Sequence, residues 1–213
     1  MQALQAPAEQ RILLENVSWE TYERLVAERQ ERPAPRFFYD RGVLELVSPS
    51  SEHEAIGHII AALIVELAVE VGIDVWGAGS TTYRSEDLKA GFEPDGSFYF
   101  AQNAQKVRGK KRIELGADPP PDLVVEVDIT SFSMNKLPIY ARLGIPEVWR
   151  HDGRRLAILG LRRDGEGYAE ASESKLLSPA TADVLTTFVA DGLKSSLPEW
   201  GRRVRSWARE ATS

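Results

Sequence analysis

PPDLVVEVDITSFSMNK, residues 120–136, is the segment that decides the expected fold. At the two-residue period of a β-strand, one face carries Leu123, Val125, Val127 and Ile129, and the other carries Asp122, Val124, Glu126 and Asp128. The first face is entirely apolar and is expected to pack on a core. The second face carries three carboxylates, which are costly in a strand unless they are paired or bind a metal ion. The segment therefore predicts a strand with one buried face and one acidic face, followed by Lys136 near the start of a helix.

Two further segments are expected to meet this strand. Residues 93–100, EPDGSFYF, form a second β-rich run that is headed by Asp95. Residues 52–71 predict the longest helix of the chain, because apolar side chains recur in it every three or four residues. Glu52 and His53 lie at the start of this apolar stripe and are expected to point toward whatever the helix covers. Both residues also fit a purely local role at a helix N-terminus.

The other segments predict strands and helices in mixed order. Residues 19–30 predict a helix, residues 36–47 predict a β-hairpin around a glycine turn, and residues 147–161 predict two strands. Residues 101–120 lack a clear periodicity, and we expect them to form a long polar loop. This order of elements predicts an α/β protein with a mixed β-sheet flanked by helices.

The composition is that of a soluble globular protein. The 213 residues are 43% hydrophobic and 27% charged, and they include only three histidines. They include no cysteine, which excludes disulfides and thiolate-bound zinc. We expect a single domain over residues 1–213, with residues 1–10 flexible and a basic helix near the C-terminus at residues 193–210. The apolar runs are too short to span a membrane and the N-terminus does not resemble a signal sequence, so we expect a cytoplasmic protein.

The charge distribution gives a mixed indication about nucleic acid. The net charge of −6 argues against a protein that coats nucleic acid without regard to sequence. Basic side chains nevertheless cluster at residues 106–112 and again at residues 202–209. Such clusters are more often solvated surfaces than phosphate-binding sites.

Asp95 and Glu126 are the candidate ligands of a metal ion. If adjacent strands place them opposite each other, two carboxylates converge on one point, and Mg²⁺ prefers oxygen ligands and retains several waters. Such an ion can activate water and neutralise charge on a phosphodiester, and Lys136 could reach the same point to stabilise the phosphate. The alternative is structural, with Asp95 ending a turn and Lys136 paired with Asp128 on the surface.

The ordered series of segments resembles the Uma-type family of restriction endonucleases, a bacterial group in the PD-(D/E)XK nuclease superfamily. The resemblance covers residues 15–190 and rests on SPSSEHE (48–54), EPDGSFYF, PPDLVVEVDITS, GIPEVWRHD (144–152), and Lys136 with Tyr140 four residues later. It implies a restriction-endonuclease-like core that binds Mg²⁺ or Mn²⁺ and acts on DNA. By position, Asp95 and Glu126 would be the metal-binding acids, Lys136 the catalytic lysine, and His53 or Glu52 the site residue at the start of the long helix.

One position departs from the pattern of the superfamily. The order D/E-x-K would place a lysine at position 128, where this chain has Asp128. Either Lys136 takes over the role of that lysine or the site is impaired, and Asp128 could serve as an additional metal ligand. Basic side chains of residues 106–112 could then supply phosphate contacts.

The sequence leaves three functions open. The first is a magnesium-dependent DNA endonuclease that hydrolyses phosphodiester bonds with a metal-activated water. The second is a catalytically degenerate nucleic-acid-binding domain with the same fold, and the third is a protein-interaction module whose acidic strand binds a basic partner. Cutting both strands of a duplex requires two active sites or two visits, so the first function would favour a homodimer.

Overall fold

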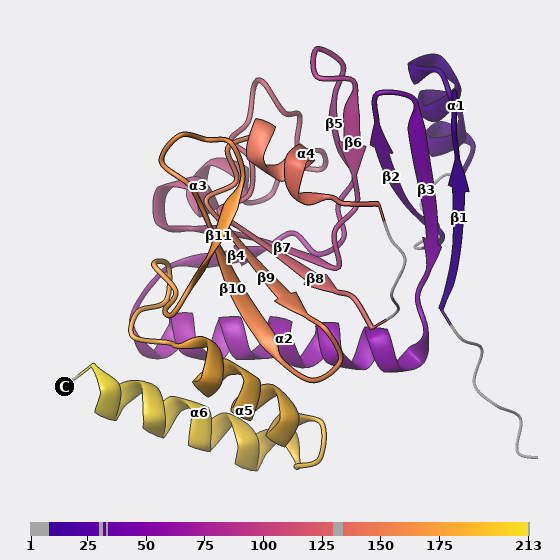
Figure 1. Ribbon diagram of the computed structural model, residues 1–213. Helices are drawn as coiled ribbons and strands as arrows, with labels where there is room; N and C mark the ends of the chain where they lie inside the picture. Colours follow the sequence, from indigo (N-terminus) through magenta and orange to yellow (C-terminus); the bar gives the residue numbers. More distant parts are fainter. Residues whose placement is uncertain (1–8, 30–31, 33, 130–133, 213) are drawn as a thin grey trace, which may run out of the picture.

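Two β-sheets and six helices make up the computed structural model of the chain, which describes residues 9–29, 32, 34–129 and 134–212 (Figure 1). The larger sheet has six strands in the spatial order β11 (Tyr168–Ala171), β10 (Leu156–Leu161), β9 (Glu147–His151), β8 (Leu123–Val127), β7 (Gly96–Phe100) and β4 (Val75–Gly77). Strands β8 and β9 are parallel, and the other neighbouring pairs are antiparallel. The predicted mixed sheet is therefore confirmed, and β8 is the predicted acidic strand.

The second sheet is smaller and was not predicted as a separate unit. Its five antiparallel strands lie in the order β1 (Gln10–Leu14), β3 (Val43–Ser48), β2 (Arg36–Asp40), β6 (Ala90–Phe92) and β5 (Tyr83–Ser85). The predicted hairpin is present as β2 and β3. Of the N-terminal segment expected to be flexible, residues 1–8 lie outside the described residues, whereas Gln10 already begins β1.

Helices pack against both sheets. They are α1 (Trp19–Arg29), α2 (Ser51–Glu70), α3 (Ala101–Val107), α4 (Leu137–Arg142), α5 (Ala182–Gly192) and α6 (Leu197–Ala211). The long helix α2 runs beneath the larger sheet, and α5 and α6 pack beside it (Figure 1). The C-terminal helix begins at Leu197, because α5 continues to Gly192 and a turn separates the two helices. In the part of the chain that the structure describes, no helix is long and apolar enough to cross a membrane.

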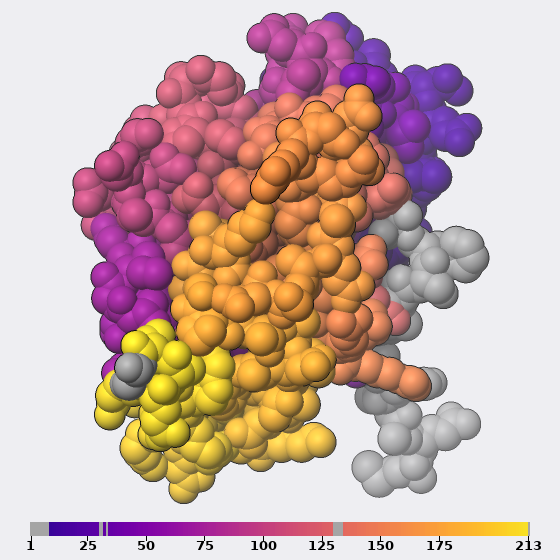
Figure 2. All heavy atoms as spheres, turned by 60° about the vertical axis from the view of Figure 1, so that its left-hand side comes forward, coloured from indigo at the N-terminus to yellow at the C-terminus, as the bar shows by residue number. Residues whose placement is uncertain are grey.

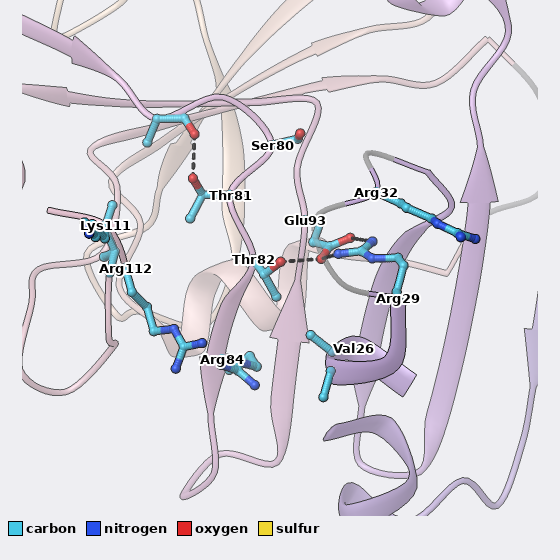
Figure 3. Close-up of a pocket in the computed structure, with 13 residues that line it drawn as sticks. Val26, Arg29, Arg32, Ser80, Thr81, Thr82, Arg84, Glu93, Lys111 and Arg112 are labelled. Carbon is cyan, nitrogen blue, oxygen red and sulfur yellow. Dashed lines mark hydrogen bonds and ion pairs between the residues drawn. The ribbon is translucent and has the colours of Figure 1, made fainter. Parts of the chain in front are cut away.

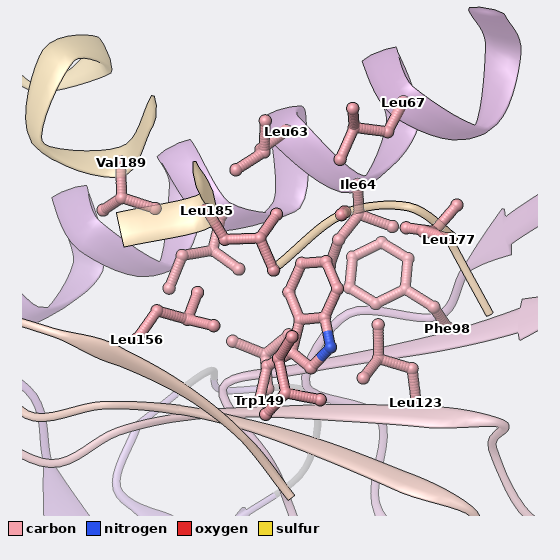
Figure 4. Packing of buried hydrophobic residues seen from close by; sticks show 14 of the residues in the cluster. Leu63, Ile64, Leu67, Phe98, Leu123, Trp149, Leu156, Leu177, Leu185 and Val189 are labelled. Carbon is pink, nitrogen blue, oxygen red and sulfur yellow. The ribbon is translucent and has the colours of Figure 1, made fainter. Parts of the chain in front are cut away.

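The main core lies between α2, α5, α6 and the larger sheet. Leu123 and Val125 of β8 belong to it, which confirms the predicted apolar face of that strand. Figure 4 shows the indole ring of Trp149 surrounded by side chains from the helices and from neighbouring strands. On the face shown in Figure 2, β10 and β11, in orange, lie above the yellow C-terminal helix. Close packing of this layer fixes the position of β8 within the sheet.

The opposite face of β8 is buried as well. Val124 packs there against a second apolar cluster, which includes Phe38 of β2, Phe92 of β6 and Tyr140 of α4. Glu126 points to the same face as Val124 and is itself buried. The acidic face of the strand is therefore enclosed by the smaller sheet and by α4, so its carboxylate needs a specific partner.

Residues 101–120, which were expected to form a loop, begin with helix α3, so that prediction is wrong for the first third of the segment. Asp122 lies 22 residues after Phe100 and 19 after Asn103 in the sequence. Its carboxylate accepts hydrogen bonds from the backbone N–H of Phe100 and from Nδ2 of Asn103, each at 2.8 Å. A residue outside the helix thus fixes the position of its first turn. This explains why the local pattern did not indicate a helix start.

Candidate active site

Asp95 and Glu126 are brought opposite each other by the pairing of β7 and β8. Gly96 pairs with Val125 in an antiparallel register, so the residue before Gly96 lies across from the residue after Val125. The backbone N–H of Val127 donates a hydrogen bond of 2.7 Å to Oδ2 of Asp95, which holds the aspartate against the end of β8. Two carboxylates from distant parts of the chain therefore lie side by side.

Glu126 is buried and is held by two side chains that follow it in sequence. Nζ of Lys136 donates to its Oε2 at 2.6 Å, and the hydroxyl of Tyr140 donates to its Oε1. Burial raises the pKa of Glu126 to about 7; the ammonium of Lys136 opposes this rise, and the negative charges of Asp95 and Asp128 add to it. The pKa of this carboxylate therefore lies close to neutral pH, and any cation brought near it would lower that pKa.

Lys136 immediately precedes α4, close to the predicted start of that helix. Its side chain is 7% exposed, and Nζ lies 3.7 Å from the centre of the Phe38 ring, a cation–π contact. Burial favours the neutral amine, but the charges of Glu126, Asp95 and Asp128 outweigh burial and raise the pKa of Lys136. The lysine is therefore a fixed, protonated ammonium within the acidic cluster, and it is not paired on the surface with Asp128.

Asp95 has a second set of partners on its other side. Oδ1 lies 2.8 Å from Nε2 of His53 and also accepts a hydrogen bond from Nη1 of Arg36. Burial would raise the pKa of Asp95, but its hydrogen bond to His53 and the charges of Lys136, His53 and Arg36 lower it. Asp95 is therefore ionised at neutral pH, next to a glutamate that holds its proton far more tightly.

The start of α2 separates the two candidates of the sequence analysis. His53 is 2% exposed, and its Nδ1 contacts the carboxylate of Glu9 while its Nε2 faces Asp95. Burial disfavours the imidazolium, but the carboxylates of Asp95 and Glu9 outweigh burial and raise the pKa of His53. Glu52, one residue earlier, is exposed. The structure therefore brings His53 to the acidic pair and leaves Glu52 outside it.

Asp128 follows the end of β8 at the edge of the cluster. Its side chain is 27% exposed, but its Oδ1 is buried and has no hydrogen-bond partner in the described residues. The nearest cation is Nη2 of Arg11 on β1, at 3.6 Å. Nη1 of the same guanidinium lies 3.5 Å from Oε2 of Glu45, a buried carboxylate of β3. Arg11 thus links two acids of the cluster to the N-terminal strand.

A hollow of about 310 Å³ opens beside these groups. Glu126, Asp128, Lys136 and Tyr140 are among the side chains that line it, and Arg150 stands at its edge as an exposed cation. Asp95 is not among the lining residues. A substrate placed in the hollow would therefore meet Lys136, Glu126 and Asp128 before it met Asp95.

The donor set suits a hard divalent cation, although it is not a preformed cage. Asp95 and Glu126 present carboxylate oxygens, and Asp128 has a buried oxygen that lacks a hydrogen-bond donor. Among the residues that the structure describes, no three Asp, Glu, His or Cys side chains are arranged as a metal-binding group. Mg²⁺ is commonly bound by only one or two carboxylates and keeps several waters, so the residues present fit such an ion.

Sequence reasoning missed several members of this network. Glu45 and Arg36 are buried polar groups in contact with the acids or with their partners, and Tyr140 was noted only for the family resemblance, without its hydrogen bond to Glu126. A signal existed for Glu45, since it is the one charged side chain within the apolar run of β3. No local signal existed for Arg36, because its role depends on the approach of β2 to the 93–95 segment.

The fold and the buried acid–lysine pair define a protein of the restriction-endonuclease-like class. A family model described as "Putative restriction endonuclease", Uma2, matches residues 19–191, and the chain belongs to this family. Among solved structures, a "putative nuclease belonging to DUF820" from Anabaena variabilis ATCC 29413 is similar, with 12% sequence identity and a TM-score of 0.51. The similarity covers 81% of this chain and 99% of that one, and it supports the fold. The search of curated proteins finds no significant match.

Proposed function

We propose that this protein is a metal-dependent DNA endonuclease that hydrolyses phosphodiester bonds with a metal-activated water. The observation that carries the proposal is the buried contact of 2.6 Å between Lys136 and Glu126 beside the carboxylate of Asp95. Burying an ammonium and two carboxylates is costly, and a hydrophobic substitute would often serve stability as well. A functional requirement accounts for such a cluster better than a structural one does.

Asp95 and Glu126 would hold the ion, with Asp128 as an additional oxygen donor. When bound, Mg²⁺ or Mn²⁺ activates a water molecule and neutralises negative charge on the phosphodiester. Asp95 is ionised in advance by His53 and Arg36, whereas Glu126 must release a proton to bind a cation. The two acids therefore make different contributions to the same site.

Lys136 would act on the phosphate. Its ammonium lines the hollow and is held in place by Glu126 and by the Phe38 ring. From there it can donate a hydrogen bond to a phosphate oxygen, on which negative charge increases in the transition state. The lysine thereby supplies from the segment before α4 the cation that the superfamily pattern would place at position 128.

His53 would position Asp95 and would not touch the substrate. Both of its ring nitrogens face carboxylates, and the side chain is 3% exposed. A group enclosed in this way can fix the orientation and charge of Asp95, but it has no free nitrogen for a proton transfer to DNA. Arg36 has the same effect, since its Nη1 donates to the same oxygen of Asp95, Oδ1, that His53 contacts.

Nicking of a supercoiled plasmid tests the proposal. The wild-type protein is expected to nick and linearise the plasmid with Mg²⁺ or Mn²⁺ and to lose this activity in EDTA. Asp95→Asn and Glu126→Gln are each expected to reduce cleavage at least about a hundredfold. Glu166→Gln, an exposed acid in the turn between β10 and β11, is the matched control and should cleave as the wild type does.

Cleavage by both Asp95→Asn and Glu126→Gln at the wild-type rate would refute the assignment of the site. DNA binding without cleavage under any metal would instead favour the catalytically degenerate nucleic-acid-binding domain. If neither DNA nor a metal ion binds, a protein-interaction module becomes the better explanation.

A double-strand break would need two such sites, and we include a homodimer in the proposal for that reason. Sedimentation of the protein with and without a duplex oligonucleotide tests this part separately. A monomer under both conditions would limit the enzyme to nicking one strand in each encounter.

A further inference from the structure

A second and larger hollow has a volume of about 670 Å³, and Glu93, two residues before Asp95, is among the side chains that line it (Figure 3). It is bounded by the end of α1 and the residues after it, by the segment that leads into β5, and by the connection that follows α3. Five of its lining side chains are cations and one is an acid: Arg29, Arg32, Arg84, Lys111, Arg112 and Glu93. In a chain with a net charge of −6, this is a strong local excess of positive charge.

Two of the five cations already have partners inside the protein. Arg29 donates to both carboxylate oxygens of Glu93, and Nη1 of Arg84 lies 3.1 Å from Oε1 of Glu23. Arg32, Lys111 and Arg112 are exposed, and none of them forms an ion pair within the described residues. Figure 3 shows Arg32 on one side of the hollow and Lys111 and Arg112 on the other. Three uncompensated cations therefore flank it from opposite sides.

The floor of the hollow is rigid. Glu93 is 1% exposed and accepts hydrogen bonds from Arg29, from the hydroxyl of Thr82 and, at 2.9 Å, from the backbone N–H of Phe37. Because every oxygen of this carboxylate is engaged, Glu93 neutralises Arg29 and leaves the other cations unaffected. The floor of the hollow is therefore the neutralised Glu93–Arg29 pair, whereas the cations at its rim keep their charge.

This floor is tied directly to the acidic site. Phe37 binds Glu93, and its neighbour Arg36 binds Asp95, two residues further along the chain from Glu93. Two residues of chain span at most roughly 7 Å, which is comparable to the axial rise of two nucleotides in one strand of DNA, at about 3.4 Å each. The floor of the hollow and the acidic site are therefore joined by a short segment of chain, residues 93–95.

We propose that the hollow is a phosphate-binding subsite in which Lys111, Arg112 and Arg32 hold the backbone of a nucleic-acid strand whose neighbouring phosphate lies at Asp95 and Glu126. This inference rests on the proposed nuclease function for the identity of the ligand. Guanidinium groups match phosphate oxygens with two parallel hydrogen bonds, and a lysine adds a compact charge. Contacts of this kind position the strand without reading its sequence.

The test measures binding in the absence of cleavage. A fluorescein-labelled duplex oligonucleotide is titrated with protein in EDTA at several salt concentrations, and the anisotropy gives the dissociation constant. The double variant Lys111→Ala/Arg112→Ala is expected to bind about tenfold more weakly at about 100 mM salt, and to lose about 1.8 from the slope of log K against log salt, since each phosphate contact contributes about 0.9. Single-stranded oligonucleotide is measured in the same way.

Arg154→Ala/Arg163→Ala is the matched control. It removes the same charge from exposed positions in the turns on either side of β10, and it should bind as the wild type does. Equal losses in both double variants, or no loss in either, would overturn the subsite. Displacement of the DNA by polyglutamate at an equal concentration of charge would overturn it too, because the hollow would then bind any polyanion and would not be specific for phosphate.

The outcome separates this inference from the proposed function. If Lys111→Ala/Arg112→Ala cleaves and binds normally, the nuclease proposal stands and the subsite fails. If that variant loses binding while the wild-type protein shows no cleavage with any metal, the subsite stands and the hydrolytic proposal fails.

Discussion

Nζ of Lys136 lies 2.6 Å from Oε2 of Glu126, and the two residues are ten positions apart in the sequence, one in β8 and the other immediately before α4. Both side chains are buried, so neither charge can be solvated if the other is removed. The pair shows how this chain places a lysine at an acidic cluster although position 128 carries an aspartate. Its geometry makes the lysine the most direct test of the proposed chemistry.

Lys136→Met is expected to reduce DNA cleavage at least about a hundredfold, because it removes a phosphate donor, while Mn²⁺ binding is retained at alkaline pH, where Glu126 is ionised without the help of the ammonium. Lys136→Arg keeps the charge in a different shape and should recover only part of the activity. Plasmid nicking and manganese titration measure the two effects separately. Lys194→Met, an exposed lysine after α5, serves as the control. Wild-type cleavage by Lys136→Met would remove the lysine from the mechanism.

The raised pKa of Glu126 predicts a pH-dependent affinity for metal. Below about pH 7 a proton competes with the cation for this carboxylate, so affinity for Mn²⁺ should rise by up to about tenfold per pH unit and then level off at higher pH. Calorimetry in two buffers of different ionisation enthalpy should detect the proton released on binding. An affinity that does not change between pH 6 and pH 8, to within about twofold, would show that Glu126 is already ionised.

A second buried glutamate provides the control for that measurement. Glu147 is 2% exposed and accepts hydrogen bonds from the indole of Trp149, the hydroxyl of Ser174 and the backbone of Lys175. Glu147→Gln should keep the metal affinity and its pH dependence. Glu126→Gln should lose both.

Tyr140→Phe isolates the hydroxyl that donates to Glu126. Its loss leaves a buried carboxylate oxygen without a donor, which raises the pKa of Glu126 further and costs about 1–3 kcal/mol of stability. The rising limb of the pH–rate profile should move to higher pH, with much of the activity restored under alkaline conditions. Tyr83→Phe, which removes a buried hydroxyl bonded to Ser97, should lower stability without moving the profile. An unshifted profile for Tyr140→Phe would assign the hydroxyl to packing alone.

Elements with a strong local pattern were predicted well from the sequence. The alternation in β8 and the apolar stripe of α2 each identify one buried face, and burial of that face is what stabilises the element. The position of β1 could not be predicted in the same way. Ile12, Leu13 and Leu14 are exposed, so the strand is held mainly by backbone pairing with β3, which leaves no two-residue pattern.

The candidate site was predictable only as a set of residue types. Asp95, Glu126 and Lys136 could be selected because acids in apolar strands are costly, and the structure does bring them together. The partners of Asp95 were harder to select: His53 was one of two candidates with Glu52, and Arg36 was missed, since both side chains reach Asp95 through the packing of α2 and β2 against the larger sheet. Those contacts are separated by more than forty residues in sequence, and no local period encodes them.

The raised pKa of His53 predicts a pH-dependent contribution to stability. His53 binds its proton more tightly in the folded protein than in the unfolded chain. The stabilisation is therefore complete below about pH 6.5 and is lost as the pH rises through the higher folded-state pKa. His53→Gln should therefore lower the free energy of unfolding more at pH 5.5 than at pH 9, as measured by urea denaturation. The titration of Glu126 occurs in both proteins and largely cancels in the difference.

His58→Gln provides the comparison, because His58 lies on the same helix with its side chain exposed. Its effect on stability should be small, within about 0.5 kcal/mol, at every pH. A destabilisation by His53→Gln that is the same at both pH values would show that His53 is neutral in the folded protein. Asp95 would then be held in its ionised form by Arg36 and Lys136 alone, and cleavage by His53→Gln should follow the wild-type pH profile.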